Sequence, residues 1–169
     1  MQLWFFIPKY QLLSESFMYE FKDKLNFELI QNYQKVSEEF RKEFNLEIDH
    51  KTNWLYWTNR EKLDYLKKLK MYEIVNAEYV IAYKAVKSNY SSVFKPGLVY
   101  SVGNVYKAHC NCNSNISSSF GLSAWTFDEA KKYYSKGKIL KVKIPIEKLG
   151  CITDDNKIRC FELEVLEEL

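Results

Sequence analysis

The chain has 169 residues, of which 47% are hydrophobic and 28% charged, with few glycines and prolines, and this composition argues against a disordered chain. Its 25 basic and 22 acidic residues give a net charge of +3, which is too balanced for the strongly basic face of a typical nucleic-acid-binding protein. No apolar run approaches the roughly 18 residues of a membrane span, and the start lacks the basic region of a signal peptide. We therefore expect a cytoplasmic protein with no membrane partner and with reduced cysteines.

The first 44 residues predict mainly helices. Residues 3–7 form a continuous apolar run closed by Pro8, which is typical of a short buried strand or an anchoring segment. Apolar side chains then recur at helical spacing over residues 12–44, with Ser14 as a candidate N-cap and Asn26 as a candidate break. This stripe is wide and aromatic, so it forms either the core-facing side of the helices or a partner-binding surface.

A further helix is predicted from residue 58 to about residue 71. Thr58 and Glu61 have the spacing of a capping box, in which each side chain accepts a hydrogen bond from the backbone of the other residue. Trp54 and Trp57 lie just before this cap. They either pack the helix onto the core or form an aromatic platform for a base or a sugar.

The second half of the chain predicts strands with one helix between them. Residues 79–86 have the β-branched and aromatic content of a buried strand. Residues 98–106 predict a strand interrupted by a turn at Gly103, and residues 108–119 are a loop by composition.

Residues 120–145 predict a helix and a strand with almost no sequence between them. Thr126 and Glu129 have the spacing of a second capping box, and Gly137 is expected to end the helix. Residues 138–144 then alternate between apolar and basic side chains, as a half-buried strand does. Residues 157–166 predict one final strand.

Together these elements predict an α+β fold. A mainly helical N-terminal region, residues 1–77, packs on a small, mostly antiparallel sheet with one inserted helix, in residues 78–169. No linker rich in proline, glycine or serine separates the two regions, so we expect one compact unit.

Few residues are arranged for metal or nucleophilic chemistry. His109, Cys110 and Cys112 resemble half of a zinc site, with Cys151 and Cys160 as candidates for the other half. Structural zinc ligands usually come in pairs with two to four residues between them, which neither pair here has, so we expect no bound metal. The sequence motifs of hydrolases, kinases and dehydrogenases are also missing.

Glu162 and Glu164 lie two residues apart in the last predicted strand, so both project from the same face. Paired carboxylates on one face can perform acid–base or electrostatic work. The same pattern is typical of the solvent face of an edge strand, and the sequence leaves both interpretations open.

Five short segments in the second half of the chain form a pattern. They are Tyr83-Lys84-Ala85-Val86, Tyr100-Ser101-Val102-Gly103, Gly121-Leu122-Ser123 followed by Ala130, Lys143-Ile144-Pro145 and Lys157-Ile158-Arg159-Cys160. Over residues 83–166 this pattern resembles an uncharacterised family of domains common in phages, giant viruses and bacterial mobile elements. Ser123 stands where that family usually has His. The resemblance implies a fold and a phage-like origin.

Two segments are also similar to ADP-ribosyltransferases. Ser123-Ala124-Trp125 precedes a helix, as the Ser-Thr-Ser-like strand of those enzymes does, and Glu162 and Glu164 match their Glu-x-Glu strand end. Lys84 stands where those enzymes bind NAD through Arg or His. The resemblance implies Ser123, Glu162 and Glu164 as catalytic residues, with Glu164 stabilising an oxocarbenium-like transition state and NAD as the cofactor.

Three functional hypotheses follow. The first is a non-enzymatic accessory protein of a phage or mobile element that binds a host protein, for example to inhibit a bacterial defence system. The alternative is an ADP-ribosyltransferase-like enzyme that modifies a host target. The third is a nucleic-acid-binding module that uses Lys141, Lys143 and the lysines of the inserted helix, whose binding would depend strongly on salt.

Overall fold

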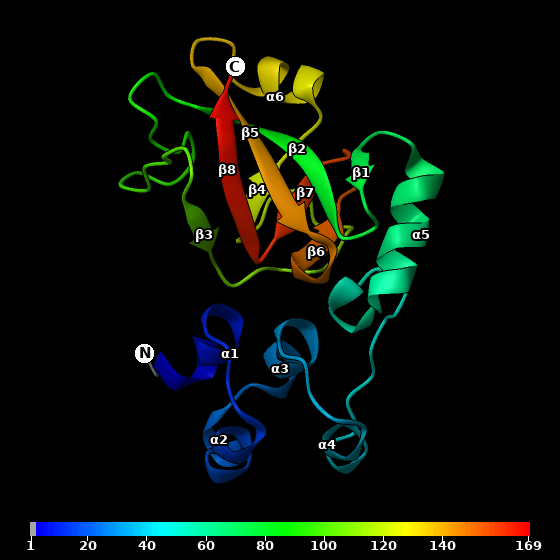
Figure 1. Cartoon of the computed structure of the whole chain (residues 1–169). Helices are drawn as coiled ribbons and strands as arrows, with labels where there is room; N and C mark the ends of the chain where they lie inside the picture. The colour runs from blue at the N-terminus through cyan, green and yellow to red at the C-terminus, as the bar shows by residue number, and fades with distance from the viewer. Residues whose placement is uncertain (1–2) are drawn as a thin grey trace.

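Two antiparallel β-sheets are built from strands within residues 73–168 (Figure 1), and the computed structural model describes residues 3–169. In spatial order, the large sheet contains β1 (Glu73–Val75), β2 (Tyr79–Val86), β5 (Lys138–Pro145), β8 (Glu162–Glu168) and β3 (Val105–Lys107). The small sheet contains β4 (Leu122–Ala124), β7 (Ile158–Cys160) and β6 (Leu149–Ile152). The predicted α+β fold is therefore confirmed.

Short helices surround the sheets (Figure 1). The α-helices are α1 (Ile7–Tyr10), α2 (Glu15–Glu20), α3 (Phe27–Tyr33), α4 (Glu38–Glu43), α5 (Asn59–Leu69) and α6 (Phe127–Tyr133). Short 3-10 helices are η1 (Leu3–Phe6), η2 (Lys22–Lys24), η3 (Trp54–Tyr56) and η4 (Ile146–Lys148). Helices α1 to α4 lie at one end of the sheets, α6 lies at the other end, and α5 lies beside β1. No helix within residues 3–169 has both the length and the apolar character needed to cross a bilayer.

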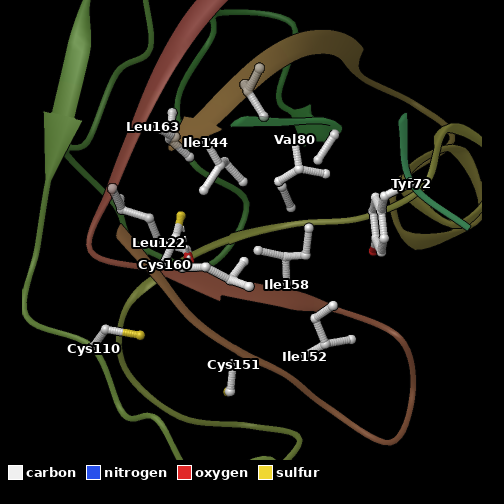
Figure 2. Close-up of a cluster of buried hydrophobic side chains, with 14 of the residues drawn as sticks. Tyr72, Val80, Cys110, Leu122, Ile144, Cys151, Ile152, Ile158, Cys160 and Leu163 are labelled. Atoms are coloured by element: carbon white, nitrogen blue, oxygen red, sulfur yellow. Dashed lines mark hydrogen bonds between the residues drawn. The ribbon is translucent and has the colours of Figure 1, made fainter. Parts of the chain in front are cut away.

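The main hydrophobic core lies between the two sheets. Figure 2 shows Val80 and Ile144 of the large sheet facing Leu122, Ile158 and Cys160 of the small sheet. The strand alternation predicted for residues 138–144 produces this arrangement, because every second residue of β5 points into the core and is fully buried.

The chain passes from the small sheet to the large sheet at Phe161. Its N–H donates to the carbonyl of Lys148, and its carbonyl accepts from the N–H of Ala108 beside β3. The single strand predicted over residues 157–166 is therefore wrong, since β7 and β8 belong to different sheets. The alternation of buried residues also shifts by one position at this break. Ile158 and Cys160 are buried before it, and Leu163 is buried after it.

The N-terminal helices enclose a second hydrophobic cluster. It consists of Met18, Leu25, Ile30, Val36 and Phe40, with partly buried aromatic rings packed around it. The aromatic stripe thus forms mainly a core of its own. This cluster and the core between the sheets contain no common residue.

Two of the predicted boundaries in this region are confirmed, and one prediction is wrong. Ser14 caps α2 by accepting from the N–H of Phe17, and Asn26 caps α3 by accepting from the N–H of Leu29. The strand considered for residues 3–7 is instead η1 and the start of α1. Pro8 lies in the first turn of α1, where its fixed φ favours a helix over a strand.

Helix α5 belongs with the sheets. Its capping box between Thr58 and Glu61 is present with both reciprocal hydrogen bonds. Trp54 is only 1% exposed and its ring stacks on that of Trp57 at 4.1 Å between centroids, which confirms the packing interpretation. The hydrophobic clusters therefore separate between Leu46 and Trp54, whereas the division of domains at residues 77 and 78 stays a prediction.

Helix α6 begins at its predicted cap, where Thr126 accepts from the N–H of Glu129. The carboxylate of Glu129 pairs with Lys132 instead of closing a capping box. Gly137 lies three residues beyond the C-cap residue Tyr134. Its role is close packing, because a Cβ atom there would lie 1.9 Å from the carbonyl oxygen of Val86.

The strand predicted over residues 98–106 is shorter than expected. Only Val105–Lys107 pairs as a strand, β3, against β8. Gly103 does form the predicted turn, with a φ of +81° that favours glycine. The preceding residues instead form a loop in which Ser91 and Val99 make an isolated bridge.

Candidate functional site

A cavity of about 810 Å³ opens beside β4, which is the edge strand of the small sheet. Its walls come from β2, β3, β4, β7, α6 and the loops on either side of β3. At the end of β4 the two sheets meet, because Tyr83 of β2 and Trp125 exchange backbone hydrogen bonds of 2.8 Å in both directions. The cavity therefore lies where the sheets begin to separate.

The cavity wall combines positive charge with aromatic surface. Its basic side chains are Lys84, Lys95, Lys107, His109, Lys157 and Arg159, and its aromatic rings are Tyr10, Phe94, Tyr100, Tyr106, Phe120, Trp125 and Tyr133. No Asp or Glu is among the described residues that line it. A wall of this kind favours a ligand that carries negative charge and a flat apolar group.

Arg159 is the most deeply buried charge of the wall. It is only 1% exposed, and its Nη2 donates to the carbonyl of Asn113 and to Sγ of Cys151. Its Nε and Nη1 have no hydrogen-bond partner among the described residues, and none of the carboxylates in residues 3–169 forms an ion pair with it. A buried guanidinium without an anion is strongly destabilising, so this position calls for a negatively charged partner.

His109 lies in the wall near two phenylalanine rings. Its ring centroid is 5.4 Å from that of Phe120 and 6.2 Å from that of Phe161. Neither Nδ1 nor Nε2 has a hydrogen-bond partner among residues 3–169. Burial lowers the pKa of this imidazole, so at neutral pH it offers one donor and one acceptor to a ligand.

Lys84 projects from β2 toward the gap between the sheets. Its Nζ donates to the carbonyl oxygen of Ser123 at 2.7 Å and lies 4.8 Å from the centroid of the Tyr100 ring. The side chain is 5% exposed. Burial lowers the pKa of Lys84 to about 8, because a buried ammonium loses its hydration.

Ser123 lies in the cavity wall, as one of the three residues expected from the ADP-ribosyltransferase resemblance. It stands directly opposite Arg159 in the register of β4 and β7. Side chains of directly paired residues share one face of a sheet, so the hydroxyl of Ser123 and the guanidinium of Arg159 lie on the same side. Lys84 contacts only the backbone carbonyl of Ser123.

Glu162 and Glu164 do not line the cavity. Leu163 between them is fully buried in the core, so both carboxylates lie on the outer face of the large sheet. Glu162 pairs with Lys107 at 3.0 Å, and Glu164 pairs with Lys143 at 3.1 Å. The structure thus brings Ser123 and Lys84 together and leaves the glutamates in surface ion pairs.

Three of the lysines considered for nucleic-acid binding, Lys132, Lys141 and Lys143, are also paired. Lys141 binds Glu167 at 3.0 Å, and Lys143 binds Glu164. Of the helix lysines, Lys132 binds Glu129 at 2.7 Å. Such pairs reduce the positive potential that a phosphate backbone would meet.

The four cysteines are buried free thiols. Cys110 and Cys151 come close enough to share one acceptor, since each Sγ donates to the carbonyl of Asn111, at 3.5 Å and 3.6 Å. Burial raises the pKa of Cys151 to about 11 and that of Cys160 to about 12, so both thiols are protonated at neutral pH. Within residues 3–169, no three His, Cys, Asp or Glu side chains are grouped so that they could hold a metal ion.

A group of exposed aromatic and apolar side chains also lies at the start of the chain, and one of them, Tyr10, lines the cavity as well. Trp4, Phe5, Phe6, Tyr10 and Leu12 are between 39% and 67% exposed, and we refer to them as the N-terminal aromatic surface. The ring of Trp4 stacks on Phe17 and Phe21 of the helical cluster. Tyr10 reaches Phe120 at the cavity, at 6.1 Å between ring centroids.

Comparison with protein-family models, curated proteins and solved structures finds no match for this chain.

Sequence reasoning assigned no ligand-binding role to Arg159, considered His109 only as a candidate zinc ligand, and considered Lys84 only through its place in the two family patterns. For Lys84 and Arg159, the sequence did contain a sign of a buried cation. Lys84 interrupts the apolar run of residues 79–86, and Arg159 lies between the apolar residues Ile158 and Cys160. A single cation inside a buried strand must have a partner, and the sequence does not show which one. His109 carries no such signal.

Proposed function

We propose that this protein binds a small anionic molecule in the cavity beside β4. The observation that supports this proposal is Arg159, which is 1% exposed and has two nitrogens free of hydrogen bonds within the described residues. An anion bound to Nε and Nη1 would neutralise the buried charge and satisfy both donors at once.

The rest of the wall suits a ligand with an aromatic part. A volume of about 810 Å³ is in the range of small-molecule binding sites. The rings of Tyr100 and Tyr106 lie 4.7 Å apart, and those of Trp125 and Tyr133 are stacked at 4.5 Å. Flat apolar groups bind well against such rings, so we expect an anionic group and an aromatic group in the same molecule.

Calorimetric titration with 2-naphthyl phosphate tests this proposal, with 2-naphthol as the neutral counterpart. We expect the phosphate to bind more tightly than the naphthol, and Arg159→Met to remove most of that difference, because the variant loses a charge-assisted pair worth roughly 2 kcal/mol.

Arg60→Met is the matched control, because the side chain of Arg60 is 91% exposed on α5. It should leave binding unchanged. Equal affinities of wild type and a folded Arg159→Met variant for 2-naphthyl phosphate would remove the proposal, as would a wild type that binds neither compound.

A second proposed function is the binding of a host protein by an accessory protein of phage or mobile-element origin, for example to inhibit a bacterial defence system in the host cytoplasm. The N-terminal aromatic surface favours it, because exposed aromatic residues are enriched in protein interfaces. The phage-like resemblance of residues 83–166 points to the same setting.

A pull-down from bacterial lysate with tagged protein tests this second function. We expect one host protein to be captured in a stoichiometric amount by the wild type and by Arg159→Met, and to be lost from the double variant Phe5→Ser, Phe6→Ser. If the double variant still captures the host protein, the N-terminal aromatic surface is not the interface.

The ADP-ribosyltransferase alternative has less support from the geometry. In that mechanism Ser123 and Glu164 would face one bound NAD. Ser123 lines the cavity, whereas Glu164 lies outside it and pairs with Lys143. Transfer of labelled NAD to a target protein, abolished by Glu164→Gln, would restore this alternative.

A further inference from the structure

We propose that Lys84 is a reactive amine that forms an imine with an aromatic aldehyde bound in the cavity. This inference uses the cavity of the proposed function but not its anion site at Arg159, so each can fail without the other.

Lys84 differs from most lysines of the chain by its surroundings. Eight lysines, among them Lys107 and Lys143, form ion pairs with carboxylates. Lys84 forms none within residues 3–169 and is 5% exposed. An ammonium in such a place lacks both water and a counter-ion, which favours the neutral amine.

Lys62 offers a comparison inside the same molecule. It is 6% exposed, and its Nζ donates to the carbonyl of Leu149 at 2.7 Å, just as Lys84 donates to Ser123 at 2.7 Å. Only Lys84 lines the cavity. The two amines therefore share their burial and their hydrogen bond, and differ in whether a ligand can reach them.

The contacts of Lys84 leave its amine available for reaction. A neutral amine has two N–H donors and one lone pair. One N–H is held by the carbonyl of Ser123, and the ring of Tyr100 lies 4.8 Å from Nζ. With a pKa of about 8, about a tenth of the amine is neutral at pH 7. Enzymes activate lysine nucleophiles in the same way, by desolvation.

The reaction is balanced without any other reagent. The lone pair of Nζ attacks the aldehyde carbon and gives a carbinolamine. Loss of one water then forms the C=N bond, and this water carries away the carbonyl oxygen with the two protons of the amine. The aromatic rings around Lys84, among them Tyr100 and Trp125, favour an aldehyde attached to a flat ring.

The test uses pyridoxal and pyridoxal 5′-phosphate as probes on the intact protein. Each is added in equimolar amount, the imine is reduced with borohydride, and the modified lysines are identified by peptide mass spectrometry. We expect Lys84 to be labelled at least about tenfold faster than Lys62 or any exposed lysine, because its lowered pKa gives more neutral amine than the ordinary value of 10.5 would and because Lys84, unlike Lys62, lines the cavity.

Two variants test whether the amine of Lys84 itself carries the fast labelling. Lys84→Arg keeps the positive charge and should abolish the fast labelling, whereas Lys62→Met should not affect it. If Lys84→Arg does not fold, the identity of the labelled lysine in the wild type still tests the inference. Labelling spread over exposed lysines with Lys84 unmodified would overturn the inference.

The two probes distinguish the imine from the anion site. Arg159→Met should slow labelling by pyridoxal 5′-phosphate more than labelling by pyridoxal, because only the first probe carries the anionic group that Arg159 would bind. If each probe labels Lys84 at the same rate in the wild type and in Arg159→Met, the imine inference is supported and the anion site is contradicted. If 2-naphthyl phosphate binds but neither probe labels Lys84, the anion site is supported and the imine inference is contradicted.

Discussion

Lys84 and Arg159 are buried cations, and stability alone would not favour a charged side chain at either position. Each lies in a strand whose neighbours are apolar, and each lines the same cavity. An apolar side chain at either position would fit a sheet core better. Residues that break such a local rule are concentrated at functional sites, which is why both proposals depend on this pair.

The buried amine of Lys84 makes stability depend on pH. Its pKa falls from the ordinary value of 10.5 to about 8 on folding. Between these values the folded protein binds fewer protons than the unfolded chain, so stability rises with pH in this window. The destabilisation by the buried charge is complete below pH 8 and disappears above 10.5.

We predict that the free energy of unfolding of the wild type, relative to Lys84→Met, increases by about 2 to 3 kcal/mol from pH 7 to pH 10, since each unit of pKa shift corresponds to about 1.4 kcal/mol. Urea denaturation at several pH values measures this difference, in which the contributions of the buried cysteines and tyrosines cancel. Lys68→Met on the exposed face of α5 is the control and should give a constant difference. A constant difference for Lys84→Met as well would show that Lys84 is not buried as described.

Gly137 lies in the turn between α6 and β5, and the close packing around it leaves no room for a side chain. A Cβ atom at this position would lie 1.9 Å from the carbonyl oxygen of Val86 and 2.7 Å from the ring of Tyr134. We predict that Gly137→Ala lowers the free energy of unfolding by about 3 kcal/mol, because backbone atoms must move to admit the methyl group.

Gly97→Ala is the comparison for Gly137→Ala. Gly97 has a φ of +88° but open space around its Cβ position, so it should lose only about 1 kcal/mol through backbone strain. Thermal or urea denaturation measures both variants. Equal losses would mean that the structure accommodates the added methyl group and that lack of space does not determine the need for glycine at residue 137.

Among the secondary-structure elements, helices α2 to α6 begin at side-chain caps, and these caps are not equivalent. At α5, Thr58 and Glu61 form both hydrogen bonds of a capping box, at 3.2 Å and 2.7 Å. At α6, Thr126 accepts a longer bond of 3.4 Å, and Glu129 pairs with Lys132 instead. Two identical sequence signals thus give one full capping box and one single cap.

We predict that Thr58→Ala destabilises the protein by about 1 to 2 kcal/mol, and that Thr126→Ala destabilises it by about 0.5 kcal/mol, because only the first substitution removes a reciprocal pair. Urea denaturation of the two variants tests the order. Thr58→Ser keeps the hydroxyl and should restore the wild-type value. A larger loss for Thr126→Ala than for Thr58→Ala would contradict this account.

At the scale of the whole molecule, two hydrophobic clusters are joined by a small number of contacts. Tyr56 near α5 donates to the carbonyl of Gln34 in the helical part and accepts from the N–H of Val36 there. Tyr33 contacts Phe120 of the cavity wall at 5.4 Å between ring centroids. Contacts this few allow the helical part to open by itself.

We predict that Phe40→Ala lowers the stability of the helical cluster by about 3 to 5 kcal/mol, since Phe40 is fully buried there. Hydrogen exchange followed by mass spectrometry should then show faster exchange in residues 15–44 and unchanged exchange in β2 and β5. Ile144→Ala in the core between the sheets is the control that should accelerate exchange in β2 and β5. Faster exchange of β2 and β5 in Phe40→Ala would show that the two clusters unfold as one.

Local sequence patterns predict several helix caps and two strands of this protein correctly. The caps at Ser14, Asn26 and Thr58, the strand β2 and the alternation in β5 all follow from interactions between residues close in the chain. The α+β class follows from their order. The change of sheet at Phe161 was not predicted, because one strand was expected over residues 157–166 and β7 and β8 belong to different sheets.

The position of the candidate site depends on how the strands are ordered and packed, which local sequence patterns do not show. Lys84, Ser123 and Arg159 come from three strands of two sheets, and their meeting depends on strand order and on the bridge between Tyr83 and Trp125. Glu162 and Glu164 were correctly placed on one face, yet that face points away from the cavity. The physical reason is that periodicity shows which residues share a face, whereas the packing of the sheets determines what that face meets.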